Sequence, residues 1–388
     1  MPPPAAHPPL SSIRPQNMIM PLPSLRLCFR LRPPPFRALR PLSTTTPTIP
    51  YTPTCPPATC PCAATPPDLD IDRATPLLNT MAAYAEHIVV CTGQRDWTSR
   101  IEDDEGETGA FVRGLKGVVG KGGKAFDPFN PLLTTASSLP ASRTPHTSHI
   151  LLFPSFTRHA SLAHTPSSLS AFASAHLAAR TLSPFHSALP APQRAALLRD
   201  NSPATRSRLP PAEPIASVTV LICGHGARDR RCGVLGPLLE DGFRRELARR
   251  GVRGAEVGVV SHVGGHKFAG NVVVYVPPGW WWRGRADDNS DGGDGGSSSS
   301  GNSSGSSGGD EAPHALAGTG VWYGRVGPEH VEGIVEETVV QGRIISELFR
   351  GGVRSGGGDL GRELEAQMKR EKGEEEEGRL ALKPKKRG

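Results

Sequence analysis

The stretch ASVTVLICGHGARDRRCG, residues 216–233, carries two cysteines, and the stretch VGVVSHVGGHKFAGNVVVYV, residues 257–276, carries two histidines. Each pair follows an apolar, β-branched run, which is typical of a buried strand. Strands of one sheet hold the loops at their ends in fixed positions, so residues far apart in the sequence can meet there. The sequence therefore predicts that four side chains come together: Cys223, Cys232, His262 and His266.

Two thiolates and two imidazoles make a ligand set suited to zinc or to an iron–sulfur cluster. Eight residues separate the cysteines, and such a wide loop favours a cluster over a tight zinc knuckle. Rieske centres use the same donor types, although the order Cys, Cys, His, His found here differs from theirs. Zinc, a Cys223–Cys232 disulfide and unligated thiols are the alternatives. His225 lacks a nearby partner and is expected to lie beside the site rather than in it.

The elements around these residues predict a βαβ unit. Residues 235–250 place apolar side chains at helical spacing and are followed by Gly251, which indicates a helix between the two predicted strands. A further strand is predicted at 271–276. Glycine at 264 and 265 lets the histidine turn adopt positive φ and pass close to a bound group.

The motif C-x8-C followed by H-x-G-G-H resembles the sucrase/ferredoxin-like family, over roughly residues 83–352. The resemblance implies an α/β (α+β) fold of two thioredoxin-like domains, of which the second is a thioredoxin-like ferredoxin. It also implies a [2Fe-2S] cluster, with Cys223 and Cys232 on one iron and His262 and His266 on the other. We expect five residues to surround these ligands and tune the site: Arg228, Asp229, Gly264, Gly265 and Lys267.

Charge is concentrated at the N-terminus. Residues 1–67 hold six arginines and no acidic residue, so six of the seven net positive charges lie there and the remainder carries a formal charge of +1. A nearly neutral remainder gives no electrostatic case for nucleic-acid binding. Arginine, proline, serine and threonine in an acid-free segment indicate an organelle transit peptide over residues 1–50. A proline-rich tail, or a true start at Met81, is the alternative.

Composition shifts divide the chain into segments. No run of 18 apolar residues occurs, so no membrane span is expected. The predicted segments are a transit peptide (1–50), a Cys/Pro-rich linker (51–82), an N-terminal thioredoxin-like domain (83–175), a linker (176–211), the ferredoxin domain (212–352) with a disordered Gly/Ser insertion (284–312), and a charged disordered tail (353–388). Within the ferredoxin domain, 321–323 is expected to be an edge strand. A helix is expected to begin near residue 328, with the apolar residues from 334 to 349 on one face.

Four other cysteines are candidate redox thiols. Cys55, Cys60 and Cys62 cluster in the predicted linker, and Cys91 ends a predicted strand. The three linker cysteines have no helix N-terminus or basic neighbour that would lower their thiol pKa, and Cys91 has no CxxC partner, so a structural or linker role is expected first.

The sequence thus predicts an electron carrier with a [2Fe-2S] cluster, acting in mitochondrial redox homeostasis with a redox partner protein that it does not identify. The matrix is the favoured compartment and the cytoplasm the alternative. Substrate-converting activity is not indicated. Two other functions stay open: a thiol–disulfide oxidoreductase and a zinc-stabilised interaction module.

Overall fold

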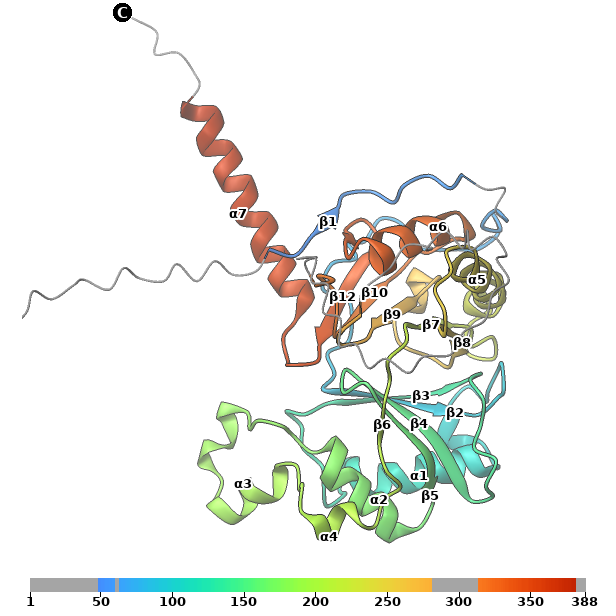
Figure 1. Cartoon of the computed structure of the whole chain (residues 1–388), viewed down its shortest axis with the longest axis vertical. Coiled ribbons are helices and arrows are strands. Elements are labelled where there is room, and N and C mark those ends of the chain that lie inside the picture. The colour runs from blue at the N-terminus through green and yellow to red at the C-terminus, as the bar shows by residue number, and fades with distance from the viewer. Residues whose placement is uncertain (1–47, 60–62, 281–312, 382–388) are drawn as a thin grey trace, which may run out of the picture. The chain divides into compact units, whose positions relative to one another are not determined.

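The computed structural model describes residues 48–59, 63–280 and 313–381, which form a mixed α/β structure around one ten-stranded sheet (Figure 1). The strand order is β12-β10-β9-β7-β8-β3-β2-β4-β5-β6. The C-terminal half contains β7 (Thr219–Cys223), β8 (Glu256–Val260), β9 (Val272–Val276), β10 (Thr319–Tyr323) and β12 (Phe349–Arg354). The N-terminal half contains β2 (Glu86–Cys91), β3 (Leu132–Ser137), β4 (Thr147–Phe153), β5 (Thr157–Ala163) and β6 (Glu213–Pro214).

The C-terminal half begins with the predicted βαβ unit. β7 and β8 pair in parallel, and α5 (Arg230–Arg249) connects them. Every residue of β7 is buried, as expected for a β-branched strand covered on both faces. β9 and β10 add antiparallel strands on the other side of β7.

The N-terminal half repeats this order. β2 and β3 are parallel and are connected by α1 (Glu107–Val119), while β4 and β5 add antiparallel strands. After its last hairpin strand each half continues into a short α-helix that ends in a π-helical turn. These helices are α2 (Pro166–Phe172) with residues 173–177, and α6 (Val331–Ile334) with residues 335–340. The predicted α/β class with two thioredoxin-like halves is therefore confirmed.

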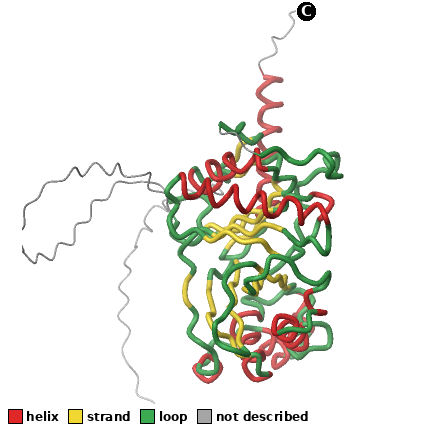
Figure 2. Tube along the Cα trace, turned by 90° about the vertical axis from the view of Figure 1, so that its right-hand side faces the viewer, coloured by secondary structure: helices red, strands yellow, loops and turns green. Residues whose placement is uncertain are grey.

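The two halves meet at one antiparallel residue pair, Ser137 with Val260. The sheet then folds back on itself, because Phe153 of β4 stacks on Tyr275 of β9 with ring centroids 3.8 Å apart, although several strands separate β4 from β9 in the sheet. Buried sheet residues fill the space between the halves, and the helices lie on the outer sides. Figure 2 shows helices at both ends of this stack and strands between them.

Residues 48–59 and 63–82, which we call the strap, pack along the C-terminal half instead of forming a free linker. β1 (Tyr51–Thr52) pairs in parallel with β11 (Ile344–Ile345). The amide of Ile49 donates to Oε1 of Gln367 at 2.8 Å. Farther along, the amide of Met81 donates to the carbonyl of Arg350 at 3.2 Å.

The segment predicted as the second linker contains two short helices, α3 (Ala191–Leu197) and α4 (Pro203–Arg206). Ordered structure also extends past residue 352, since β12 ends at Arg354 and α7 spans Leu360–Ala381. Leu360 and Leu364 at the start of α7 are fully buried.

Two predicted elements of the C-terminal half are wrong. The helix expected from 328 to 349 ends at Val340, and the apolar residues beyond it belong to β11 and β12. Gly342, with φ of 69°, turns the chain out of the helix. Strand β10 is not an edge strand, because it pairs with β9 on one side and with β12 on the other.

No helix in the described part of the chain is both long and apolar enough to cross a membrane. The predicted transit peptide, apart from residues 48–50, and the predicted insertion at 284–312 lie outside the described residues.

Candidate functional site: a Cys–Cys–His–His centre

The two cysteines meet where β7 runs into α5. Cys223 is the last residue of β7, and Cys232 lies in the first turn of α5. Both thiols are free, and the residues are 2% and 1% exposed. A hydrogen bond from the Cys232 thiol lowers the pKa of Cys223 well below its ordinary value and raises that of Cys232. The pair thus favours one thiolate, on Cys223.

The two histidines lie in the turn after β8. Their ring centroids are 5.5 Å apart, with the ring planes tilted by 41°. His262 also contacts the Cys223 thiol and contributes to its lowered pKa. His266 begins a short 3-10 helix that ends at Phe268, and its side chain is exposed. The turn therefore brings one imidazole to the buried thiols and leaves the other at the surface.

The predicted ligands are consequently brought to one place by the ends of β7 and β8. The two thiols are close enough to influence each other's pKa, the two imidazole rings have centroids 5.5 Å apart, and His262 also lowers the pKa of Cys223. Within the ranges that the structure describes, no group of three or more His, Cys, Asp or Glu side chains is arranged to hold a single metal ion. The donor chemistry and the pairing of like donors fit a two-iron cluster, which takes thiolates on one iron and imidazoles on the other.

Gly264 and Gly265 have positive φ, at 87° and 72°, as the sequence predicts. A Cβ at Gly265 would overlap the guanidinium of Arg350, whereas a Cβ at Gly264 would meet open space. Glycine at 265 therefore serves both the backbone turn and the close approach of Arg350.

Arg350 is a site residue that the sequence analysis missed. Only 2% of it is exposed, and its guanidinium donates to the Gly264 carbonyl at 3.1 Å and to Oδ1 of Asn271 at 2.6 Å. Burial lowers its pKa to about 10, and the Cys223 thiolate opposes that shift. Among the described residues no carboxylate forms an ion pair with it. The Gly-Gly turn signals a close approach, but the sequence does not indicate which residue approaches.

His225 plays a larger part than its isolation in the sequence suggests. It is 1% exposed, and its Nε2 lies 3.1 Å from the Trp97 carbonyl and 3.0 Å from the Thr98 carbonyl. These two acceptors place the proton on Nε2, so Nδ1 can accept the backbone N–H of His262 at 3.1 Å. His225 thereby fixes the start of the histidine turn to the N-terminal half.

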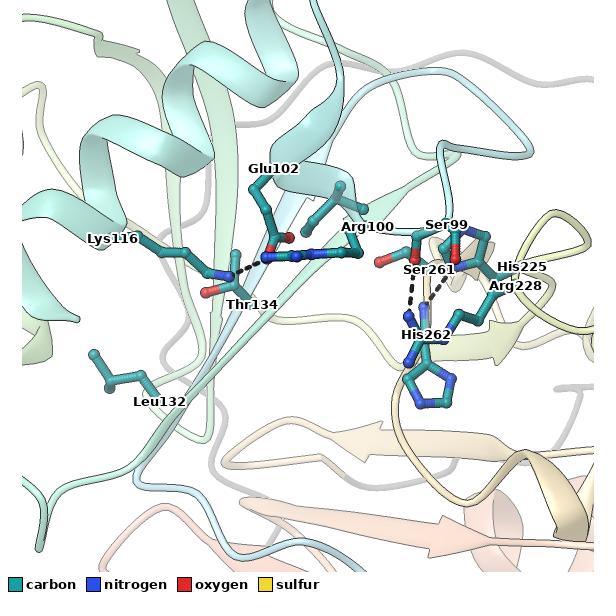
Figure 3. A pocket seen from close by; sticks show the side chains of 11 residues that line it. Ser99, Arg100, Glu102, Lys116, Leu132, Thr134, His225, Arg228, Ser261 and His262 are labelled. Atoms are coloured by element: carbon teal, nitrogen blue, oxygen red, sulfur yellow. Dashed lines mark hydrogen bonds and ion pairs between the residues drawn. The ribbon is translucent and has the colours of Figure 1, made fainter. Parts of the chain in front are cut away.

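The predicted residues around the ligands have different roles. Asp229 caps α5, because its Oδ1 accepts the amide of Arg231 at 3.0 Å. Lys267 pairs with Asp72 of the strap at 3.0 Å. The Arg228 guanidinium donates to the Ser99 carbonyl at 3.2 Å, in the loop that precedes α1 (Figure 3).

The other candidate thiols do not join this centre. Cys91 is buried at the end of β2, and Cys55 is half-buried in the strap, with its Sγ 3.6 Å from the His330 carbonyl. Burial raises the pKa of each thiol to about 12, which disfavours the reactive thiolate. Cys60 and Cys62 lie outside the described residues.

Three curated relatives illustrate the similarities of this chain. Altered inheritance of mitochondria protein 32 of Debaryomyces hansenii is 38% identical over 141 residues, which are 36% of this chain and 38% of that protein. The protein of the same name in Clavispora lusitaniae is 41% identical over 138 residues, or 36% of each chain. Actin patches distal protein 1 of Saccharomyces cerevisiae is 41% identical over 66 residues, or 15% of this chain and 21% of that protein.

The matched stretch thus spans under two fifths of the length of these relatives. No solved structure matches the chain. The sucrase/ferredoxin-like family model matches residues 77–351, from the end of the strap to β12, which is more than half of the sequence and includes all four converging side chains. The chain therefore belongs to the sucrase/ferredoxin-like family.

Proposed function

We propose that the protein is an electron carrier with one [2Fe-2S] cluster, held by Cys223 and Cys232 on one iron and by His262 and His266 on the other. The observation that supports this most directly is the convergence of the two cysteines, where β7 runs into α5, with the two histidines of the turn after β8, whose ring centroids are 5.5 Å apart. A bound cluster would supply one-electron redox chemistry. The chain itself would supply the ligands, a dry pocket for the sulfurs and a nearby positive charge.

The surroundings of the four residues suit a centre that gains negative charge. Buried Arg350 would stabilise the thiolates and the extra electron of the reduced state. The cysteines are shielded from water while His266 is exposed. A partner protein could therefore approach on the histidine side without opening the fold.

Metal and sulfide analysis of the anaerobically purified chain tests the proposal. We expect about two iron and two acid-labile sulfide per chain, from the stoichiometry of a [2Fe-2S] centre, together with a visible absorption band and an EPR signal on reduction. The variants Cys223→Ser, Cys232→Ser and His262→Ala should lose iron, while Cys55→Ser should keep it.

Other outcomes would point to the alternative functions. One zinc per chain without sulfide would contradict the cluster and indicate a zinc-stabilised interaction module. Metal-free protein with a reversible Cys223–Cys232 disulfide, detected by alkylation-shift gels, would indicate thiol–disulfide exchange, which the shared proton of this pair would favour.

We further propose that the protein acts in mitochondria, in redox homeostasis. The names of two relatives and the arginine-rich, acid-free residues 1–50 support this location. A C-terminally tagged full-length chain should co-fractionate with mitochondria, and a chain lacking residues 1–47 should not. Equal cytoplasmic recovery of both would contradict the proposal.

A further inference from the structure

A pocket of about 480 Å³ opens beside His262. Its volume lies in the range of small-molecule sites. Figure 3 shows two groups of polar side chains at its opposite ends. Arg228, Ser99, Ser261 and His262 lie at one end, which we call the histidine end. Arg100, Glu102, Lys116 and Thr134 lie at the other, which we call the lysine end.

The charges of this pocket favour an anion. Three cationic side chains line it, namely Arg100, Lys116 and Arg228, against the single carboxylate of Glu102. Glu102 is engaged by Lys116 at 2.6 Å and by Arg100 at 3.3 Å, and Arg100 also pairs with the exposed Asp103 at 3.8 Å. Arg228 donates only to a backbone carbonyl, and among the described residues it has no carboxylate within ion-pair distance. The lining therefore carries three positive charges and one negative charge, and Arg228 is its cation without an anionic partner among the described residues.

The pocket is also built on fixed elements. His225, which lines it, is held by carbonyls of the 97–98 loop, and Ser261 Oγ accepts the amide of Ala136 in β3 at 3.0 Å. Lys116 projects from α1, and Glu102 lies in the 3-10 helix just before it. Because both halves of the sheet contribute walls, the pocket exists only where β3 meets β8.

We propose that this pocket binds a small acidic molecule with two negatively charged groups, one on Arg228 at the histidine end and one on Arg100 and Lys116 at the lysine end. Charge-assisted hydrogen bonds from guanidinium and ammonium groups are the strong polar interactions of such sites. The ligand would lie against His262, so its negative charge would act on the proposed cluster through that side chain. This role rests on the proposed function, whereas the binding itself does not.

Isothermal titration calorimetry on the full chain at low ionic strength tests the binding. Glutarate carries two carboxylates, 3-sulfopropionate carries a carboxylate and a sulfonate, and acetate is the single-charge control. We expect saturable binding of at least one dianion, weakened by added salt, and at least tenfold weaker binding of acetate. A preference between the two dianions identifies the second charged group.

Two variants should change the affinity in opposite directions. Arg228→Gln should weaken dianion binding by about tenfold or more. Glu102→Gln should strengthen it severalfold, because Lys116 loses its ion-pair partner and Arg100 keeps only the exposed Asp103, 3.8 Å away. Arg253→Gln, which removes an exposed arginine in the turn between α5 and β8, should leave it unchanged. Circular dichroism confirms that each variant is folded.

Absence of binding by both dianions, equal binding of acetate, or equal effects of Arg228→Gln and Arg253→Gln would overturn the inference. Iron content measured on the same samples tests the proposed cluster independently of anion binding. Iron-free protein that still binds the dianion would support the pocket and contradict the proposed function. A dianion-induced change in the EPR spectrum of iron-loaded protein would link the two.

Discussion

Gly264 and Gly265 share a left-handed backbone, yet only Gly265 has a guanidinium against its Cα. A side chain at either position is strained by about 1 kcal/mol. Gly265→Ala must in addition displace Arg350. We therefore expect Gly265→Ala to lower the melting temperature and iron content more than Gly264→Ala does. Equal effects of the two variants would show that Arg350 does not constrain the turn.

Arg350 places a buried positive charge beside Cys223. If a cluster occupies the site, Arg350→Gln should make its reduction potential more negative, because the reduced state loses a stabilising charge. For a one-electron couple the shift is about 59 mV for each tenfold change in the equilibrium constant. Arg354→Gln is the control, since Arg354 lies on the same strand but pairs with Glu363 at 3.2 Å. Protein-film voltammetry measures both, and an unchanged potential in Arg350→Gln would contradict the role.

At the scale of an element, helix α5 depends on Asp229 for its first turn, which carries Cys232. Asp229→Ala removes the cap and should cost about 1 kcal/mol in the free energy of unfolding. Asp229→Asn keeps an oxygen that can cap the helix and should cost less. Chemical denaturation measures the difference, and iron content reports whether Cys232 stays in place. A larger loss in the asparagine variant would contradict capping as the main role.

Strand β5 carries a buried histidine that makes the fold sensitive to acid. Both ring nitrogens of His159 lack a hydrogen-bond partner among the described residues, and burial lowers its pKa to about 3. The unfolded chain takes up a proton below about pH 6.5 while the folded chain does not. This histidine therefore reduces stability as the pH falls from about 6.5 towards 3, by about 2 kcal/mol at pH 5.

His159→Phe should remove that part of the pH dependence. We expect the variant to gain stability over the wild type on going from pH 8 to pH 5, as measured by urea denaturation at both values. Both proteins keep the acid sensitivity that comes from His87, because burial also lowers the pKa of that residue to about 3. Parallel stability curves for the two proteins would mean that His159 is not buried as a neutral ring.

Local sequence patterns predicted the elements of the site because those elements are built locally. The β-branched runs before Cys223 and His262 became β7 and β8, and the helical spacing after Cys232 became α5. The same reasoning failed from 334 to 349, where residues of a helix and of two strands happen to share a helical period. Gly342 was the available signal, and tertiary pairing of β11 with the strap decided the outcome.

At the scale of the whole molecule, the two halves share a buried polar network. The Tyr275 hydroxyl lies 2.8 Å from that of Tyr84 and 2.9 Å from Nδ1 of His87, so β9 is bonded to the N-terminal half. We expect the described core to unfold in one cooperative transition. Tyr275→Phe leaves buried polar groups without a hydrogen-bond partner. It should therefore lower the free energy of unfolding by about 1–3 kcal/mol.

Two measurements check this expectation. One is calorimetry, and the other is urea denaturation monitored both by tryptophan fluorescence and by circular dichroism. Tyr323→Phe is the comparison, because that hydroxyl bonds Thr338 within the C-terminal half. Two separate transitions in the wild-type chain would show that the halves fold independently.

The long-range features of the site could not be read from spacing. Arg350 comes from β12 and His225 bonds carbonyls of residues 97 and 98, so their partners lie far away in the sequence. Only the folded sheet brings them together. The repeat of the two halves also explains the position of Cys91. It is the last residue of β2, as Cys223 is of β7, and it pairs with Ser137 of β3, as Cys223 pairs with Val260 of β8. The N-terminal half keeps one such cysteine, but its first histidine after β3 is His146, nine residues past the strand, whereas His262 follows β8 by two.

If a leader is removed from this chain, the strap limits where the cut can fall. Ile49 is buried and bonded to Gln367, and the next residues add β1 to β11. A peptidase that removes a leader must therefore cut ahead of Ile49 if the mature protein is to keep these bonds. Cleavage or initiation at Met81 would strip away Asp72, which pairs with Lys267, and Thr80, whose carbonyl accepts from Arg350 at 2.8 Å. The site of trimming would then decide whether the guanidinium behind the histidine turn stays in position.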